Sequence, residues 1–256
     1  MDRGPHSSET ESTGNQPEIT IFGSSCKYNY GNSDFIGRGT FGIVYQASII
    51  YRGDFAGPEI VAIKVVHLDK DTVDSEDYLV KMHRRFDTLV ALNHSNIVLY
   101  HKVTLTRAPG GACIELMMDY CTGGDLATFL NKMRQSKILL GKANTIQYGL
   151  EMADGLAFLH DRRIIHGDLK PENILLMSLP NSVHRVLIGD LDDLVQIQRT
   201  STWSADIQRL RGTPRYMSPE MLRKFAGLPA EIPGRKTDIW SLGCILLDLV
   251  EVVTGN

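Results

Sequence analysis

The sequence predicts an α+β fold with a β-rich first part and a larger, mostly helical second part. Residues from about 28 to 103 favour strands and include one amphipathic helix near 75–92. After a last strand-like segment at 112–120, apolar residues recur at helical spacing. The chain has 256 residues, of which 43% are hydrophobic and 22% charged, so it can bury the core of one large domain or of two lobes.

The beginning of the chain has a different composition. Residues from 1 to about 20 are rich in Ser, Thr, Glu, Gly and Pro and have almost no large apolar side chains. Such a segment buries too little surface to offset the entropy that it loses on ordering. We therefore expect a disordered tail over 1–27 and a folded domain over 28–256.

Side-chain spacing predicts two helices and one hairpin. The helix near 75–92 repeats its apolar residues along one buried stripe, formed by Tyr78, Met82, Phe86 and Leu89. A second helix, over 145–160, carries on one side Ile146, Leu150, Ala153, Leu156 and Leu159. The Pro180-Asn181 pair predicts a turn between short strands at 173–177 and 185–188.

Composition argues against several partners and compartments. The formal net charge of −3 gives no reason to expect nucleic acid or an anionic membrane as a partner. The four cysteines form no C-x-x-C pair and no metal-ligand spacing, so reduced thiols are expected. The N-terminus is too polar for a signal peptide, and no apolar run is long enough to span a bilayer. We therefore expect a cytoplasmic or nuclear protein.

The segment 165–173 reads Ile-His-Gly-Asp-Leu-Lys-Pro-Glu-Asn. It resembles the catalytic loop of eukaryotic protein kinases, which has the pattern H-R-D-L-K-P-x-N. The resemblance implies that Asp168 accepts the proton of a substrate hydroxyl and that Lys170 reaches the transferring phosphate. It also implies that Asn173 holds a metal ion. Further motifs follow in the family's order, so the resemblance covers roughly residues 30 to 252.

A glycine-rich segment at 36–44 fits the nucleotide loop G-x-G-x-x-G-x-V of the same family. Glycines let the backbone close over phosphates where a Cβ would block the approach. The sequence Val-Ala-Ile-Lys follows at 61–64, and the resemblance assigns Lys64 to the α- and β-phosphates of ATP. Taken singly, the two motifs also fit a glycine-rich hairpin turn and a surface lysine at a strand end.

The resemblance implies a bilobal fold, with a β-rich N-lobe that contains helix αC over about 28–118 and a helical C-lobe over 122–256. A hinge at 119–121 would contact adenine mainly through backbone groups, with Met118 as the gatekeeper. The residues implied in ATP binding are Ile36, Gly37, Arg38, Gly39, Gly42, Val44, Ala62, Lys64, Met118, Asp119, Cys121, Asp125 and Leu175.

Residues 186–192 occupy the place of the family's D-F-G motif. The resemblance assigns Asp190 to the Mg²⁺ that bridges the nucleotide phosphates. Leu191 is a mild substitute for the Phe, because both side chains fill an apolar slot. Asp192 stands where the family has Gly, and this change is expected to restrict the conformational flip of the motif.

The segment 212–220, Gly-Thr-Pro-Arg-Tyr-Met-Ser-Pro-Glu, resembles the end of a kinase activation segment. Together with Lys170 it indicates Ser/Thr rather than Tyr substrates. Asp238, in the D-x-W-S-x-G motif, is expected to brace the catalytic loop. Gly167 replaces the Arg that pairs with an activation-loop phosphate in many kinases, so we expect little dependence on that phosphorylation. The candidate phosphosites, or else simply solvated loop residues, are Thr200, Ser201, Thr202 and Ser204.

One departure from the family concerns helix αC. The Glu that pairs with the strand-three lysine lies nine residues before the His of H-x-N-I-V, and this position is Arg85 here. Like charges would repel and leave Lys64 unpositioned. Asp87 is the alternative partner if the helix is shifted by two residues, but such a shift would disrupt the apolar stripe.

The second departure is the length of the C-lobe. The sequence stops at residue 256, and family kinases continue for several more helices. We expect the C-lobe to lack its last helices and Glu220 to lack its ion-pair partner. An apolar face around Leu246, Leu249 and Val250 should be partly uncovered.

The resemblance therefore predicts a protein Ser/Thr kinase that uses ATP and Mg²⁺ and acts in signalling, with weak similarity to the kinases of MAP-kinase cascades. Its partners would be protein substrates with Ser or Thr and an upstream activating kinase or a scaffold. The alternative is a pseudokinase, a scaffold that binds ATP or a partner but transfers little phosphate. A third reading is a chain that does not fold alone.

Overall fold

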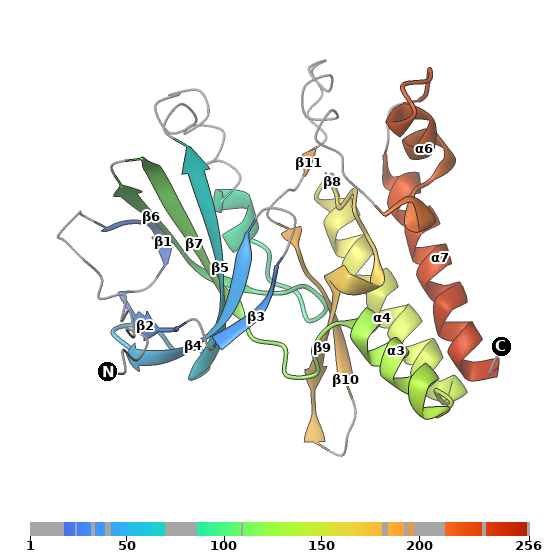
Figure 1. The fold of residues 1–256 in the computed structure, drawn as a ribbon, viewed down its shortest axis with the longest axis horizontal. Helices are drawn as coiled ribbons and strands as arrows, with labels where there is room; N and C mark the ends of the chain where they lie inside the picture. The colour runs from blue at the N-terminus through green and yellow to red at the C-terminus, as the bar shows by residue number, and fades with distance from the viewer. Residues whose placement is uncertain are drawn as a thin grey trace, which may run out of the picture.

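A computed structural model gives the fold of the chain (Figure 1). It confirms the α+β class, with a curved β-sheet half and a mostly helical half. The residues that the structure describes are 18–23, 25–31, 34–38, 42–69, 86–108, 110–180, 184–191, 195–196, 213–231 and 234–254.

The first half is built on an antiparallel sheet of seven strands. The strands are β1 (Glu18–Gly23), β2 (Lys27–Asn29), β3 (Phe35–Arg38), β4 (Ile43–Tyr51), β5 (Ile60–Asp69), β6 (Tyr100–Ala108) and β7 (Gly111–Asp119). Their order is β1-β6-β7-β5-β4-β2, and β3 pairs with the first residues of β4, from Ile43 to Tyr45. The predicted strand-rich region is therefore confirmed.

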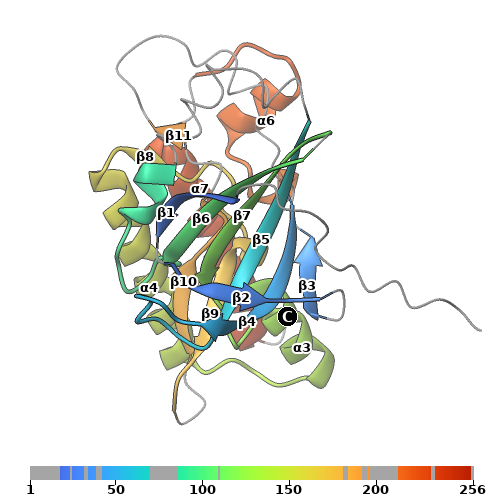
Figure 2. The same ribbon diagram turned by 90° about the vertical axis from the view of Figure 1, so that its left-hand side faces the viewer.

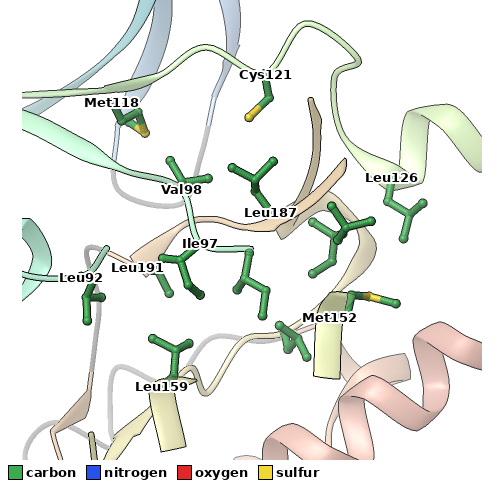
Figure 3. Packing of buried hydrophobic residues seen from close by; sticks show 14 of the residues in the cluster. Leu92, Ile97, Val98, Met118, Cys121, Leu126, Met152, Leu159, Leu187 and Leu191 are labelled. Carbon is green, nitrogen blue, oxygen red and sulfur yellow. The ribbon is translucent and has the colours of Figure 1, made fainter. Parts of the chain in front are cut away.

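Strand β5 is buried on both faces because the sheet separates two apolar cores. Its odd-numbered residues, such as Val61 and Ile63, pack with Cys26 and Met117 in a small core. Ala62 points to the other side and joins a larger core that the sheet shares with the helical half. Figure 3 shows residues of that larger core, in which Val98 and Leu187 lie between Met118 above them and Met152 and Leu159 of α4 below.

The predicted tail boundary at residue 27 is wrong. Strand β1 pairs with β6, where Ile19 faces Leu105, and Figure 2 shows the two strands side by side. Cys26 is fully buried. The sequence Glu-Ile-Thr-Ile at 18–21 alternates polar and apolar residues, which is the period of a strand, and β6 supplies the backbone groups for it to pair with. Residues 1–17 lie outside the described part of the chain.

The second half contains helices α3 (Leu126–Ser136), α4 (Lys142–Asp161), α6 (Pro219–Phe225) and α7 (Arg235–Thr254). Two small antiparallel pairs accompany them, β9 (Ile174–Ser178) with β10 (His184–Ile188) and β8 (Ile164–Ile165) with β11 (Val195–Gln196). The short 3-10 turns are η2 (Pro171–Asn173) and η6 (Pro214–Tyr216). The β9–β10 pair confirms the hairpin predicted from the Pro-Asn turn.

Helix α4 is present as predicted, but its buried side is partly different. Leu156 and Leu159 are buried, whereas Ile146 and Leu150 are 63% and 66% exposed. The side that packs into the core carries Tyr148, Met152, Gly155, Leu156 and Leu159. The helix has apolar residues on two sides, so their spacing alone does not determine which side is covered.

The predicted helix near 75–92 is described only at its end. Residues 86–90 are helical, and Phe86 and Leu89 are buried as expected. Tyr78, Met82 and Arg85 lie outside the described residues. The proposed mismatch between Arg85 and Lys64 is therefore not described by this structure.

The apolar face of helix α7 is partly uncovered, as the sequence predicted. Leu249 is completely buried, Leu246 is half-buried and Val250 is exposed. Glu220 Oε1 accepts a 2.9 Å hydrogen bond from the Thr237 hydroxyl, which is a neutral partner and not the cation that forms the family's ion pair. Within the described ranges, no helix combines the length and the apolar character needed to cross a membrane.

Candidate active site

The sheet brings several predicted nucleotide residues to one face. In the ladders Val44 faces Lys64, and Ala62 faces Met118. Residues opposite each other in an antiparallel pair share a face, so these four side chains point to the same side of the sheet. That side is the one that meets the helical half. Ala62 and Met118 are buried and Val44 is half-buried, so the surroundings of Lys64 on this side of the sheet are apolar.

The glycine-rich segment forms the hairpin between β3 and β4. Gly37 pairs with Val44, and Arg38 pairs with Ile43. A Cβ on Gly42 would lie 2.4 Å from the Val65 carbonyl oxygen, so only glycine fits this close approach to β5. Ile36 is 46% exposed at the edge of the sheet. Gly39 lies outside the described residues.

The predicted hinge begins at Asp119, the last residue of β7. The Asp119 backbone N–H donates a 3.0 Å hydrogen bond to the Leu99 carbonyl, and its Oδ1 lies 2.7 Å from His101 Nε2. Both contacts fix the start of the hinge. Cys121 is buried, and burial together with the charge of Asp119 raises the pKa of its thiol to about 12. This thiol is therefore protonated at neutral pH.

Asp125 and Leu175 lie next to each other beyond the hinge, joined by a backbone bridge between the segments that carry them. The Asp125 carboxylate caps helix α3, because it accepts hydrogen bonds from the Thr128 amide at 2.7 Å and from the Thr128 hydroxyl at 2.8 Å. Its predicted contact with a nucleotide would therefore compete with the cap.

The catalytic loop brings three predicted residues together. Lys170 Nζ lies 2.7 Å from Asp168 Oδ2, and Asn173 Nδ2 donates to the Asp168 carbonyl at 2.8 Å. Burial raises the pKa of Asp168, although the nearby Lys170 opposes this shift. The carboxylate is thus a stronger base than an exposed aspartate, and it carries a cation at its side.

Asp238 holds this loop from helix α7, as the sequence predicted. It has no exposed surface, and its two oxygens accept hydrogen bonds from the backbone N–H groups of His166 at 3.0 Å and Gly167 at 2.9 Å. His160 Nε2 lies 2.8 Å from the same carboxylate. Gly167 has a φ of 78°, which is unfavourable for a residue with a Cβ.

His166 connects the catalytic loop to the predicted metal motif. Its Nδ1 accepts a 3.3 Å hydrogen bond from the Asp168 amide, so the proton is on Nε2, which donates to the Gly189 carbonyl at 2.9 Å. Asp190 follows with a φ of 57°, a left-handed conformation that few non-glycine residues adopt. The loop and the motif are therefore fixed relative to each other.

Lys64 is positioned, contrary to the expectation from the sequence. Its ammonium lies 2.6 Å from Asp190 Oδ1, and the lysine is only 3% exposed. A buried ammonium requires such a counter-charge. The two residues are 126 positions apart in the sequence, and the contact joins the β-sheet half to the helical half. Asp192 and the candidate phosphosites lie outside the described residues.

The predicted metal residues have a suitable arrangement and chemistry. The Gly189 amide donates a 2.9 Å hydrogen bond to the Asn173 carbonyl, and Asp190 is the residue that follows Gly189. The side-chain Nδ2 of Asn173 donates to Asp168, so the side-chain oxygen of Asn173 is directed away from Asp168. An amide oxygen and a carboxylate are hard ligands of the kind that Mg²⁺ prefers when phosphate and water complete its shell. These two residues therefore fit the ion.

Sequence reasoning missed two contributors. His160 shares the Asp238 carboxylate with the loop, and Asp248 on α7 binds Arg215 and Tyr216. Asp248 carried a visible signal, because it is the one charged residue in the apolar run 244–250. His160 had no comparable signal at the end of a helix.

Residues 30–254 match the family model described as Protein kinase domain. Serine/threonine-protein kinase SSK22 of Saccharomyces cerevisiae is 31% identical, in an alignment that covers 91% of this chain and 17% of that protein. MAP kinase kinase kinase wis4 of Schizosaccharomyces pombe is 29% identical over 91% of this chain and 15% of its own length. Mitogen-activated protein kinase kinase kinase 3 of Mus musculus is 29% identical over 95% of this chain and 36% of its own length. The chain therefore spans only a minor part of these relatives.

Proposed function

Because the chain belongs to the protein kinase family, we propose that it transfers the γ-phosphate of ATP to Ser or Thr hydroxyls of protein substrates, with Mg²⁺ as the metal. The observation that carries this proposal is the catalytic loop, where the partly buried Asp168 carboxylate lies beside Lys170 and next to Asn173. Bound Mg-ATP would supply the phosphoryl group and neutralise part of its charge.

Each side chain of the loop has a role that follows from its position. Asp168 accepts the proton of the incoming hydroxyl, and its raised pKa makes it a better base at neutral pH. Lys170, whose Nζ lies 2.7 Å from Asp168 Oδ2, places a positive charge where negative charge develops on the transferring phosphoryl group. Most of the rate increase would come from such positioning and charge stabilisation.

The nucleotide would lie between the two halves of the molecule. Val44, Ala62 and Met118 would face the adenine, and hinge backbone groups from Asp119 to Cys121 would bind its edge. Lys64 would exchange Asp190 for the α- and β-phosphates or contact both. Asn173 and Asp190 would hold the metal ion. The buried Lys64–Asp190 pair supports this arrangement, because it already brings the phosphate ligand and the metal ligand together.

The named relatives suggest the setting of the reaction. SSK22 is described as a serine/threonine-protein kinase, and wis4 as a MAP kinase kinase kinase. We propose that this chain also acts in a signalling cascade in the cytoplasm or nucleus, on a protein substrate and under an upstream kinase or a scaffold. The proposal includes no nucleic acid or membrane as a partner.

The test is transfer of labelled γ-phosphate from Mg-ATP to a generic Ser/Thr protein substrate, with protein that melts cooperatively. Asp168→Asn should reduce the transfer rate by about 10²–10⁴-fold, the usual contribution of a positioned base. Asp161→Asn, which changes an exposed aspartate at the end of α4, is the matched control and should retain the parent's rate.

Two results would contradict the proposal. Equal transfer by the parent and Asp168→Asn would mean that the phosphate comes from a contaminating kinase. Absence of transfer by the folded parent would favour the pseudokinase alternative. In that case, binding of a fluorescent ATP analogue, compared between the parent and Lys64→Met, would show whether the nucleotide site itself is functional.

A further inference from the structure

A short segment before the glycine-rich hairpin packs on the face of the sheet that carries the small core. This strap comprises residues 25–30 and includes β2, which pairs with β4. The Ser25 amide donates a 2.7 Å hydrogen bond to Asp54 Oδ1. The Cys26 carbonyl accepts a 3.0 Å hydrogen bond from the ammonium of Lys102, a lysine that is only 5% exposed. The beginning of the strap is therefore fixed, and the proposed reaction uses none of these contacts.

One carboxylate on β7 fixes the end of the strap. Tyr28 donates its hydroxyl to Glu115 Oε2 at 2.6 Å, and Tyr30 donates its hydroxyl to Oε1 of the same residue. Burial and this hydrogen bond raise the pKa of the Tyr30 hydroxyl, so the hydroxyl keeps its proton and remains a donor. Hydrogen bonds from a hydroxyl to a carboxylate are among the stronger ones in proteins. Glu115 thus holds two aromatic rings of the strap against the sheet.

The two rings differ in what they contact beyond Glu115. Tyr30 stacks on Tyr45 of β4, with ring centroids 4.9 Å apart and an interplanar angle of 28°. Tyr45 faces Phe35 in the ladder between β3 and β4, and the Phe35 ring meets the Tyr45 ring edge-on at 6.4 Å. The Tyr28 ring lies 6.4 Å from the Tyr30 ring. A row of three rings, from Tyr30 to Phe35, therefore leads from Glu115 to the strand that begins the hairpin.

Strand β3 is the part of the sheet that this row of rings can influence most. It has four residues, pairs with β4 in the described sheet, and shifts its register between Phe35 and Gly37. Cross-strand side-chain pairs contribute much of the stability of such a pairing. Phe35 follows Tyr30 by five positions, and the Gly31 amide closes the intervening turn with a 2.7 Å hydrogen bond to Asp34 Oδ2. A displacement of Tyr30 would therefore be passed to Phe35 and to the hairpin.

We propose that Glu115 and Tyr30 are positioning residues for the nucleotide. Through the rings of Tyr45 and Phe35, they hold β3 at the place where the glycine-rich hairpin covers the phosphates of bound ATP. The chain thereby uses its own strap, on the face of the sheet opposite Lys64, to set the nucleotide site. This role rests on the nucleotide part of the proposed function, because it requires ATP at the hairpin.

The test compares Tyr30→Phe with the parent, because phenylalanine keeps the stacked ring and removes only the hydroxyl that Glu115 binds. Binding of a fluorescent ATP analogue with Mg²⁺ should weaken about three- to tenfold, which is part of the value of a hydrogen bond to a charged group. The KM for ATP should rise by the same factor, whereas kcat and the KM for the protein substrate should stay unchanged. Hydrogen exchange of the amides at 35–38 and 43–45 should become faster.

Three further variants separate positioning from folding. Tyr28→Phe removes a hydroxyl from the same carboxylate but leaves the stack of Tyr30 on Tyr45, so it should lower the melting temperature similarly and leave the affinity for the analogue unchanged. Glu115→Gln exchanges one acceptor oxygen for an amide donor and should weaken binding of the analogue as Tyr30→Phe does. Tyr51→Phe makes the same change at an exposed tyrosine, at the end of β4 away from the hairpin, and should alter neither stability nor affinity.

The inference is refuted if folded Tyr30→Phe and Glu115→Gln bind the analogue as tightly as the parent does. It is equally refuted if Tyr28→Phe weakens binding as much as Tyr30→Phe, because the effect would then follow the stability of the strap and not the row of rings. A parent that binds the analogue but transfers no phosphate contradicts the kinase function, and the affinities of the variants still decide the inference. A folded parent that does not bind the analogue refutes both.

Discussion

One face of helix α7 meets the catalytic loop and buries polar side chains, whereas the opposite face exposes apolar ones. The buried polar residues are Thr237, Asp238, Ser241 and Asp248. The exposed large apolar residues are Ile239, Trp240, Leu247 and Val250. This distribution is unusual for a helix, because the face toward solvent normally carries the polar residues.

The comparison shows that the two faces of α7 contribute different kinds of interaction to the fold. Hydrogen bonds and ion pairs have directions, so the inner face determines where the catalytic loop and η6 lie. Apolar contacts have no direction, and exposed apolar residues contribute little to the stability of the part of the chain described here. We expect substitutions on the inner face to affect both stability and activity, and those on the outer face to affect neither strongly.

The largest effect should come from Asp238→Ala. Two loop amides and His160 would lose their acceptor in a buried place, which should lower the free energy of unfolding by about 3 kcal/mol or more. Chemical denaturation followed by circular dichroism measures this loss, and phosphotransfer should become undetectable. Asp238→Asn keeps one acceptor oxygen and should fall between the parent and the alanine variant. A fully stable alanine variant would mean that the loop is held by other contacts.

A matched pair of leucines tests the two faces with the same chemical change. Leu249 is completely buried and Leu247 is 65% exposed. Leu249→Ala should lower the free energy of unfolding by about 2–5 kcal/mol, whereas Leu247→Ala should change it by less than about 0.5 kcal/mol. Denaturant titrations of the two variants measure both values. Similar losses in both would show that the outer face is covered in solution.

The smallest effect concerns the base that the inner face holds in place. The raised pKa of Asp168 moves the acid limb of the activity profile to higher pH than an ordinary aspartate would give. Activity should fall as pH decreases through this pKa, because the base must be ionised. Lys170→Met should move the limb further upward, because the lysine charge lowers the pKa. The measurement is kcat/KM as a function of pH for the parent and for Lys170→Met. An acid limb at the pH of an ordinary aspartate in both proteins would contradict the prediction.

The linkage to stability has a definite sign. A carboxyl group whose pKa is raised in the folded state stabilises the fold when protonated, and this contribution is lost as pH rises through the folded-state pKa. At neutral pH, Asp168→Asn should therefore be at least as stable as the parent, although it has lost activity. Comparison of the two proteins by thermal denaturation at pH 7 would check this trade between stability and function.

The sequence predicted the local parts of the site well because their residues are close in the chain. Asp168 and Lys170 are two positions apart, and the loop backbone brings their side chains together. The Asp238 brace was also predicted, from a motif. The register of the sheet, with Val44 opposite Lys64, could be expected only in outline, since strand order does not follow from spacing alone.

Other features could not be predicted, because they depend on which surfaces meet. The pairing of Lys64 with Asp190 joins distant segments, whereas the sequence indicated that Lys64 would be left unpositioned because Arg85 replaces its usual partner on helix αC. The exposed side of α4, with Ile146 and Leu150, was assigned to the core because apolar spacing identifies a stripe without identifying its neighbour. Residues 18–23 became a strand only because β6 offered a free edge.

The buried thiol of Cys121 has a consequence for chemical probes. Electrophilic inhibitors react with thiolates, and with a pKa of about 12 only on the order of one molecule in 10⁵ carries a thiolate at pH 7. An acrylamide group directed at this hinge would therefore react slowly, even when the rest of the compound binds well. Reversible ligands that exploit the shape beside Met118 are the better choice for blocking this site.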